Sequence, residues 1–256
     1  MDYIIPIYNA PAFALQRHID VLKKIPEVRN TDIRMVLIDD CSTPELNPKW
    51  PIGPNIKAAR VEDDILWHAE GAMNLGFMLA DDGWCILGCI DHIIPAEDLV
   101  KCIYLKKDKK SIYIFNRFLP NGQLRNKNVS GVCLIHRDTW WHIGGFDEEF
   151  CGEHGCTDWL SLGCINPNDR ASGNPSIASI LGYKFVQTDI KIIEYKDAGA
   201  NLHLNRYSER NWQMYLRKLE ELKQGKYHNK SKLNFKWHIT YESQFNISSS
   251  SVPSPA

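Results

Sequence analysis

The sequence lacks the features that mark several common classes of protein. Its 30 lysines and arginines are balanced by 31 aspartates and glutamates, which gives a net charge of −1 over 256 residues. No general basic field therefore draws the chain onto nucleic acid, and we expect no nucleic-acid partner. No apolar run approaches the ~20 residues that cross a bilayer, and no basic segment with an apolar leader precedes the first apolar stretch. These two absences predict a soluble protein of the cytoplasm.

Two further absences concern cysteine and glycine. The eight cysteines form no Cys-x-x-Cys pair, and several lie in apolar stretches, which is typical of reduced, buried thiols. The chain also has no glycine-rich phosphate loop of the Rossmann or Walker kind. Backbone amides are therefore not expected to be the main cradle for a phosphate. A phosphorylated ligand would need local positive charge or a metal ion.

What the sequence does contain is an alternation of apolar strands with amphipathic helices. Hydrophobic residues make up 44% of the chain, enough for a substantial core. In the first half, a helix that carries Leu15, Ile19 and Leu22 on one face follows the first strand. Strands are predicted at 3–7, 34–38, 55–61 and 84–90, and a second helix is predicted at 69–80. This order predicts an α/β fold with a central mixed, mostly parallel sheet flanked by helices.

The second half has a less regular texture. Its predicted helices cover 98–106, 138–143, 158–164 and 208–225, and its predicted strands cover 111–115, 129–136, 184–187 and 191–195. The turn-rich stretch 166–175 is expected to be a mobile loop. Lys218, Lys223 and Lys226 fall in or just after the last turns of the final helix, where cations are favoured. We expect a single domain over 1–227, with halves 1–95 and 96–227, and a partly disordered polar tail at 228–256.

Polar residues follow three of the predicted strands directly. Tyr8 and Asn9 come after the first strand, Asp39 and Asp40 after the second, and Asp91 and His92 after the strand that begins at Trp84. In open α/β sheets ligands gather outside the carboxyl ends of the strands, so these residues are expected to form one site. A carboxylate and an imidazole suit a divalent metal. The alternative for Asp91 is a cap on the helix that starts near Pro95.

The order of these motifs resembles that of the GT-A-fold glycosyltransferases of the family 2 type. The resemblance covers about residues 3–164 and rests on Pro6-Ile7-Tyr8-Asn9, Asp39-Asp40-Cys41-Ser42, Ala69-Glu70-Gly71-Ala72-Met73-Asn74, the strand that ends at Asp91, Gly144-Gly145-Phe146-Asp147-Glu148-Glu149-Phe150 and Thr157-Asp158. It implies a GT-A fold, with a Rossmann-like nucleotide-binding half fused to an acceptor-binding half. It also implies inverting transfer of a sugar from a nucleoside diphosphate sugar to a hydroxyl of a glycan or similar acceptor.

The resemblance implies two sets of binding residues. Nucleotide-sugar contacts are expected from Pro6, Tyr8, Asn9, Asp39, Asp40, Trp67, Asn74 and Asp91. A Mn²⁺ or Mg²⁺ ion is expected at Asp91, with further ligands from His92 and His203. In the family an Asp-x-Asp motif binds the metal and the diphosphate, and in this chain Cys89 stands in place of the first acid. The alternative for His203 is a surface histidine in a loop.

The resemblance also implies a general base. Asp158 matches the family's base, which would remove the proton of the acceptor hydroxyl as that oxygen attacks. The alternative role for Asp158 is the N-cap of the helix that it begins. Glu153 is the second candidate for the base. Trp67 and Trp159 are candidates for stacking on a sugar, with a place in the core as the alternative.

Partners and rival functions follow from the same residues. The expected acceptor is a glycan, or a lipid-linked or protein-linked group, and the basic run 223–236 allows peripheral contact with an anionic membrane or is simply a solvated face. One rival function is a degenerate relative that binds nucleotide-sugar or glycan without turnover, because Cys89 replaces an acid. Another is a sugar nucleotidyltransferase, which usually carries a glycine-rich basic loop after the first strand. Tyr8-Asn9-Ala10-Pro11 has neither feature.

Overall fold

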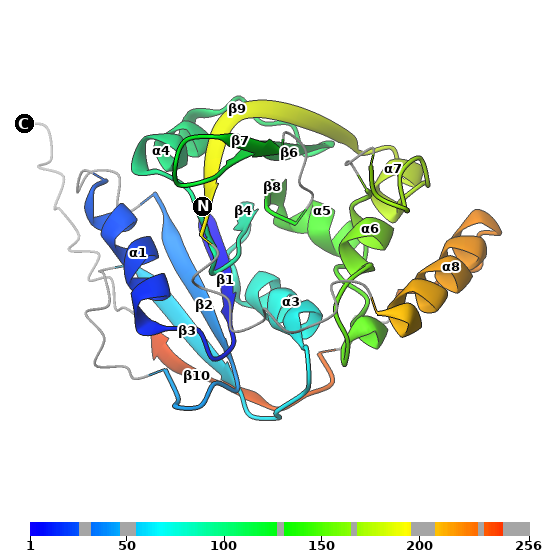
Figure 1. Ribbon diagram of the computed structural model, residues 1–256, viewed down its shortest axis with the longest axis horizontal. Coiled ribbons are helices and arrows are strands. Elements are labelled where there is room, and N and C mark those ends of the chain that lie inside the picture. The colour runs from blue at the N-terminus through cyan, green and yellow to red at the C-terminus, as the bar shows by residue number, and fades with distance from the viewer. Residues whose placement is uncertain are drawn as a thin grey trace, which may run out of the picture.

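The described residues fold around one mixed sheet of ten strands. The computed structural model describes residues 1–25, 32–46, 55–126, 131–164, 168–195, 208–229 and 233–242 (Figure 1). The strands are β1 (Asp2–Ile7), β2 (Arg34–Asp40), β3 (Ile56–Val61), β4 (Trp84–Leu87), β5 (His92–Ile93), β6 (Ser111–Phe118), β7 (Leu124–Asn126), β8 (Cys133–His136), β9 (Lys184–Glu194) and β10 (Trp237–Glu242). Their order is β10-β3-β2-β1-β4-β8-β6-β9-β5, and β7 pairs with β6.

Helices cover both faces of this sheet. They are α1 (Ala12–Lys23), α3 (Ala69–Leu79), α4 (Ala96–Tyr104), α5 (Arg137–His142), the 3₁₀ turn η1 (Glu148–Phe150), α6 (Thr157–Ser161), α7 (Ile177–Ile180) and α8 (Glu209–Lys223). Strands β3, β2, β1 and β4 form a parallel block, while β8 joins β4 in antiparallel orientation. The predicted α/β fold is therefore confirmed. Among the described residues no helix is long and apolar enough to span a membrane.

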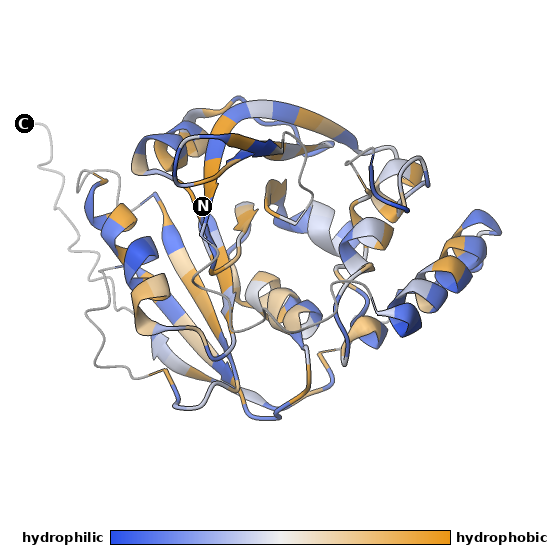
Figure 2. Cartoon of the chain, viewed as in Figure 1, coloured by the Kyte–Doolittle hydropathy of each residue, from blue (hydrophilic) through white to orange (hydrophobic). Residues whose placement is uncertain are grey.

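The alternation of side chains along the strands divides the core into two layers. On β1, Ile4 packs with α3, whereas Ile5 and Ile7 pack with α1 on the other face. Successive residues of a strand point to opposite faces, so one apolar strand supplies both layers. Figure 2 shows apolar residues concentrated on the inner strands, while α8 at the periphery alternates between apolar and polar residues. All eight cysteines are free thiols, as expected.

Several boundaries differ from the sequence-based prediction. β4 ends at Leu87, and Gly88 then lies against β1, where its amide donates to the carbonyl of Ile4 at 2.9 Å. A Cβ at Gly88 would lie 2.7 Å from that oxygen and 2.5 Å from the Tyr3 ring, so only glycine fits. β9 is one strand rather than two, with a register shift against β6, and α7 was not predicted.

The segment expected to be a polar tail also contains regular structure. β10 lies within 228–256 and pairs antiparallel with β3, so the last described residues close one edge of the sheet. Its mixture of half-buried and exposed residues lacks the apolar run that marked the central strands. Of the loop expected at 166–175, residues 168–173 form turns, 174–175 have no regular structure, and the remainder lies outside the described residues.

Candidate functional site

Three polar loops leave the sheet at one edge. β1 runs parallel to both β2 and β4, so their carboxyl ends lie on the same side. Tyr8 and Asn9 follow β1, Asp39 and Asp40 end β2, and the turn 88–91 follows β4. The structure thus brings these predicted residues to one edge, which is where α/β sheets bind ligands.

The first two loops are joined by hydrogen bonds. The amide of Asn9 donates to Oγ of Ser42 at 3.0 Å, and the amide of Thr43 donates to Oδ1 of Asn9 at 2.6 Å. Asn9 has a φ of 47°, a left-handed conformation that asparagine tolerates better than most residues. Pro6 is half-buried in β1, and the hydroxyl of Tyr8, also half-buried, lies 3.4 Å from Oδ1 of Asp64.

Asp39 holds the second loop in place. It is buried, and its carboxylate accepts hydrogen bonds from the amides of Ser42 at 2.9 Å and Leu46 at 3.3 Å. The guanidinium of Arg60 pairs with the same carboxylate and also donates to the carbonyl of Ser42. Sequence reasoning missed Arg60, which lies opposite Asp39 only because β2 and β3 pair in that register.

Asp40 belongs to a buried cluster with residues at the start of α3. Its Oδ1 lies 2.8 Å from Nδ1 of His68, and both side chains are buried. Burial raises the pKa of Asp40, and the contact with His68 acts in the opposite direction. A Cβ at Gly71 would lie 2.0 Å from Nε2 of His68, so this glycine makes room for the imidazole on the first turn of α3.

Glu70 extends the cluster toward the predicted base. It is 3% exposed, and burial, together with the charges of Asp158 and Asp40, raises its pKa to about 8. The thiol of Cys151 donates to its Oε2 at 3.8 Å. Glu70 is therefore mostly protonated at neutral pH and could donate a hydrogen bond. Sequence reasoning assigned no role to Glu70 or His68, although an acid in the first turn of an otherwise apolar helix was a usable signal.

Asp158 lies at the start of α6, but it does not cap that helix. The N-cap is Cys156, whose φ is 76°, and no side chain makes a capping hydrogen bond there. The alternative role of Asp158 as an N-cap is therefore wrong. Asp158 is half-buried, and its charge raises the pKa of Glu70. The carboxyl groups of Asp158 on α6 and Glu70 on α3 are therefore close enough to interact.

Helix α8 fixes the loop that leads to Asp158. Asn211 is fully buried and its Nδ2 donates to the carbonyls of Phe150 at 3.0 Å and Glu153 at 2.7 Å. Arg210 donates to the carbonyls of Cys151 and Glu149. Glu153, the second candidate base, is half-buried on this loop. The first turn of α8 thus determines the backbone path before α6.

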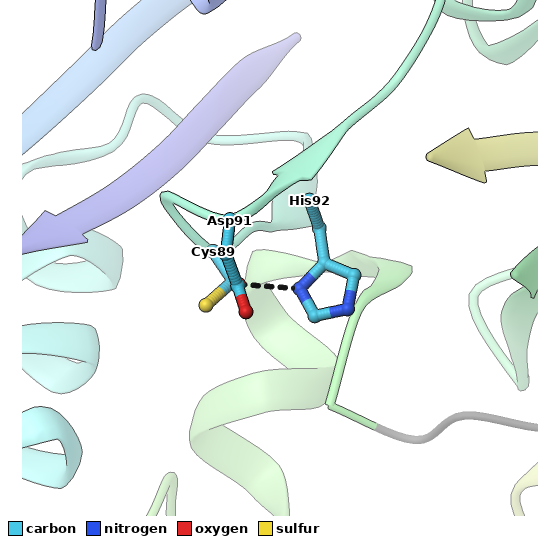
Figure 3. A group of neighbouring side chains, drawn as sticks. All are labelled: Cys89, Asp91 and His92. Atoms are coloured by element: carbon cyan, nitrogen blue, oxygen red, sulfur yellow. Dashed lines mark ion pairs between the residues drawn. The ribbon is translucent and has the colours of Figure 1, made fainter. Parts of the chain in front are cut away.

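The turn after β4 brings together three side chains that could hold a metal ion, drawn in Figure 3. One donor atom from each of Cys89, Asp91 and His92 lies within 4.8 Å of the other two. Oδ1 of Asp91 lies 2.7 Å from Nδ1 of His92. His92 is 7% exposed, and within the described part of the chain its Nε2 has no hydrogen-bond partner. His203, the third predicted ligand, lies outside the described residues.

Asp91 is not a helix cap. The N-cap position of α4 is Pro95, with no side-chain capping bond, so this alternative is wrong. Burial alone would raise the pKa of Asp91, but His92 and the thiol of Cys89 hold it well below its usual range. Burial and the neighbouring carboxylate raise the pKa of the Cys89 thiol well above its ordinary value. The pair of Asp91 and Cys89 therefore carries a single negative charge at neutral pH.

The backbone of this turn is held from three sides. The hydroxyl of Tyr3 donates to the carbonyl of His92 at 3.2 Å, and Nε2 of His18 lies 3.1 Å from the carbonyl of Ile90. The amide of Tyr195 donates to the carbonyl of Asp91 at 2.8 Å. Burial lowers the pKa of His18 to about 4, so the ring is neutral. The side chains of Cys89, Asp91 and His92 are consequently presented by a fixed backbone.

Two other predicted contacts have different surroundings. Asn74 is fully buried, donates to the carbonyl of Phe146 at 2.8 Å and accepts from the amide of Phe146 at 2.9 Å. It joins α3 to the glycine-rich segment and has no exposed atom with which to contact a nucleotide. Trp159 is 6% exposed and packs edge-on to Tyr215 in the core. Trp67 is half-buried, with its ring 4.3 Å from that of His154.

Comparison with solved structures identifies the architecture. No protein-family model matches the sequence, and no curated protein is significantly similar to it. S. aureus TarS 1–349 in complex with UDP-GlcNAc superposes with a TM-score of 0.62 at 14% identity, over 85% of this chain and 64% of that one. This chain has the GT-A fold.

Two further solved structures have the same architecture. GalNAc-T7 with UDP, GalNAc and Mn²⁺ gives a TM-score of 0.56 at 13% identity, over 86% of this chain and 48% of that one. The mannosyltransferase PcManGT of Pyrobaculum calidifontis, in complex with GDP-Man and Mn²⁺, gives 0.54 at 13% identity, over 86% and 61%. This chain thus spans between about half and two thirds of these GT-A glycosyltransferases, and the identities show a common fold alone.

Proposed function

We propose that this chain is a glycosyltransferase that uses a nucleoside diphosphate sugar. One observation carries the proposal: within a GT-A fold, the cluster of Cys89, Asp91 and His92 lies at the same sheet edge as the loops of Asp39 and Asp40. Residues 1–95 would bind the donor and 96–227 the acceptor, with the activity in the cytoplasm. Assignment to the family 2 type rests on the order of motifs in the sequence.

A divalent cation fits the turn after β4. Cys89, Asp91 and His92 offer donor atoms within 4.8 Å of one another, and Nδ1 of His92 lies 2.7 Å from Oδ1 of Asp91. In the proposed reaction Asp91 and His92 would hold Mn²⁺ or a related ion, with His203 as a further predicted ligand. When bound, such an ion would neutralise charge on the departing diphosphate.

Arginines beside this turn support a diphosphate-binding role. Arg117 and Arg125 both pair with Glu194, which lies opposite His92 in the ladder of β5 and β9. Guanidinium groups suit phosphate oxygens because their geometry allows two parallel hydrogen bonds. We propose that these two arginines favour the diphosphate of the donor.

The nucleoside would bind at the loops after β1 and β2. Asp39 and Arg60 fix the loop backbone, which leaves Tyr8 and Asn9 at the edge to contact the base or ribose. Asp40 would join them from its buried position beside His68. Trp67, beside His154, would offer a ring to a sugar. The acceptor would be a hydroxyl of a glycan, or of a lipid-linked or protein-linked group, as in polysaccharide biosynthesis.

Asp158 would act as the general base in an inverting transfer. It is half-buried at the start of α6 and would accept the proton of the acceptor hydroxyl as that oxygen attacks the anomeric carbon. Glu70, protonated beside it, adds no negative charge at neutral pH. Glu153, on the loop before α6, is the second candidate.

A second candidate function is binding without turnover. It is favoured by Cys89, which replaces the first acid of the expected Asp-x-Asp motif and keeps its proton at neutral pH. In that case the chain would bind a nucleotide-sugar through the same loops, and neither the wild type nor an Asp158 variant would show turnover.

The test is a panel of UDP- and GDP-sugars assayed for binding and for donor hydrolysis or transfer, with and without Mn²⁺. We expect Asp158→Asn to lower turnover about 10²- to 10⁴-fold while nucleotide affinity is retained, and Asp91→Asn to abolish Mn²⁺-dependent binding. Asp189→Asn is the matched control, because Asp189 is 83% exposed on β9. Binding without turnover would favour the second candidate, and the absence of binding to any nucleotide would contradict both.

A further inference from the structure

The metal-binding side chains after β4 are chemically mixed. Cys89 offers sulfur, Asp91 oxygen and His92 nitrogen, and these donors lie within 4.8 Å of one another (Figure 3). Mg²⁺ prefers an all-oxygen shell and dehydrates reluctantly. Thiolate and imidazole instead favour Zn²⁺ and the later transition metals, and affinity along that series rises from Mn²⁺ through Co²⁺. The donor set therefore does not match the oxygen shell that an Asp-x-Asp pair would provide.

We propose that Cys89 is a direct sulfur ligand which makes this site bind Zn²⁺ and Co²⁺ in preference to Mn²⁺, and Mn²⁺ in preference to Mg²⁺. The inference rests on the proposed function for the placement of the ion beside a diphosphate, but ion binding itself needs no nucleotide. Binding replaces the S–H bond of Cys89 with a sulfur–metal bond, and the proton passes to water. With the thiolate and the carboxylate of Asp91, the site then supplies two negative charges to a divalent ion.

The surroundings of Cys89 support a ligand role over a structural one. It lies in the turn after β4 rather than in the strand, and its thiol faces the side chain of Asp91. By contrast, Cys85 in β4 and Cys133 in β8 are fully buried among apolar side chains. His92 is 7% exposed, and its Nδ1 lies 2.7 Å from Oδ1 of Asp91, on the side of the ring that faces the Cys89 and Asp91 donors (Figure 3).

The fixed backbone of the turn also favours a selective site. Tyr3 and His18 hold the carbonyls of His92 and Ile90, and Gly88 fits against β1 where no larger residue can. Because the turn cannot easily rearrange, an ion must accept the donors that it presents. Selectivity between ions then depends on donor chemistry, which a substitution at Cys89 can change.

The direct test is a titration with Co²⁺ in the absence of nucleotide. A thiolate ligand to Co²⁺ produces a charge-transfer absorption band in the near ultraviolet, which an oxygen or nitrogen ligand does not. We expect the wild-type chain to show this band, Cys89→Ser to lose it, and the control Cys164→Ser to keep it. Thermal unfolding of the metal-free variants checks that each is folded, and Cys89→Ala replaces the serine variant if that one is not.

A second experiment tests whether a substitution at Cys89 shifts the preference from Zn²⁺ toward Mg²⁺. We expect Cys89→Asp to lower the affinity for Zn²⁺ by at least about tenfold, the lower end of the loss that even outer-shell substitutions cause, and to raise the affinity for Mg²⁺. Competition with a chromophoric chelator gives both constants. A wild-type chain without the band, a band that survives in the folded Cys89 variant, or an unchanged Zn²⁺-to-Mg²⁺ ratio in Cys89→Asp would overturn the inference.

The outcomes separate this inference from the proposed function. A cobalt–thiolate band without any binding of nucleotide-sugars would contradict the proposed function and leave the sulfur ligand established. Nucleotide-sugar binding and turnover without the band would contradict the sulfur ligand and leave the glycosyltransferase proposal standing.

Discussion

Two acidic segments of this protein, one at Asp91 and one at Asp147, differ in their surroundings. At Asp91, the neighbouring His92 keeps a buried nitrogen without a partner among the described residues. At Asp147, the carboxylate is fully buried and accepts from Nζ of Lys218 at 2.5 Å and from the hydroxyl of Tyr227 at 2.8 Å. The first cluster can still take a ligand and the second is complete. Partners from distant parts of the chain decide which role an acid has.

The contrast changes the interpretation of the most distinctive motif. Gly144 to Phe150 was part of the resemblance to glycosyltransferases, and in the structure its acids connect elements to one another. Lys218 also lies 2.6 Å from Glu149, and Glu148 accepts from Asn74 at 2.9 Å. Lys218 was expected to be a cation at the end of a helix, but it is 2% exposed and balances buried carboxylates. That expectation was wrong because the partners of Lys218 lie about seventy residues earlier in the chain.

The largest effect that we predict tests the completed cluster. Lys218→Met leaves Asp147 buried without its cation, and removal of one partner of a buried ion pair costs about 3–5 kcal/mol. We therefore expect the free energy of unfolding in urea to fall by that amount. Lys223→Met is the control on the same helix, because Lys223 is exposed and its replacement should change stability by less than ~0.5 kcal/mol.

A double variant sharpens this prediction. Replacing both partners, as in Asp147→Leu with Lys218→Met, removes the two charges together, and buried pairs exchanged for apolar residues are often close to neutral. The double variant should recover much of the stability that Lys218→Met loses. If Lys218→Met were as stable as Lys223→Met, the ion pair of Lys218 and Asp147 would not stabilise the fold as we describe.

The same contrast shows what the sequence could and could not predict. Local patterns located β1, β2, β3 and α3, because the two-residue and 3.6-residue periods of apolar side chains are readable within one element. The rule that ligands gather at carboxyl ends placed Asp91 and Asp40 at one edge. Contacts between remote segments were not readable, and these include the pairing of β10 with β3 and the registration of Arg60 against Asp39.

The second prediction compares two acids, the half-buried Asp91 and the buried Glu70, whose pKa values move in opposite directions. The pKa of Asp91 is lowered by its neighbours, whereas that of Glu70 is raised by burial to about 8. Between the unfolded value of 4.5 and about 8, the folded chain binds a proton at Glu70 that the unfolded chain has released. The contribution of Glu70 to stability is therefore fully present below pH 4.5 and is lost as the pH rises through 8.

We expect Glu70→Gln to remove this loss. The variant should match the wild type near pH 5 and exceed it by on the order of 3 kcal/mol near pH 9, measured by urea unfolding at each pH. Glu97→Gln is the control, because Glu97 also lies in the first turn of a helix but is exposed. Parallel pH profiles for the wild type and Glu70→Gln would show that Glu70 is ionised in the folded chain.

The smallest predicted effect concerns the loop that joins the two kinds of region. Asn211→Ala removes the amide that donates to the carbonyls of Phe150 and Glu153, and leaving buried acceptors without a donor costs about 1–3 kcal/mol. Because this loop leads into α6, we expect turnover to fall while donor affinity is kept, since the loops after β1, β2 and β4 are untouched. Steady-state kinetics and nucleotide binding separate these two effects.

Gln213→Ala is the matched control for this loop, since Gln213 lies on the same helix, is exposed and bonds only to Glu209 within α8 among the contacts described. A drop in turnover for Asn211→Ala alone would show that the contacts of α8 with the loop before α6 help to position Asp158. If both variants had equal turnover while Asn211→Ala lost stability, Asn211 would stabilise the fold only, because the position of Asp158 would then not depend on α8.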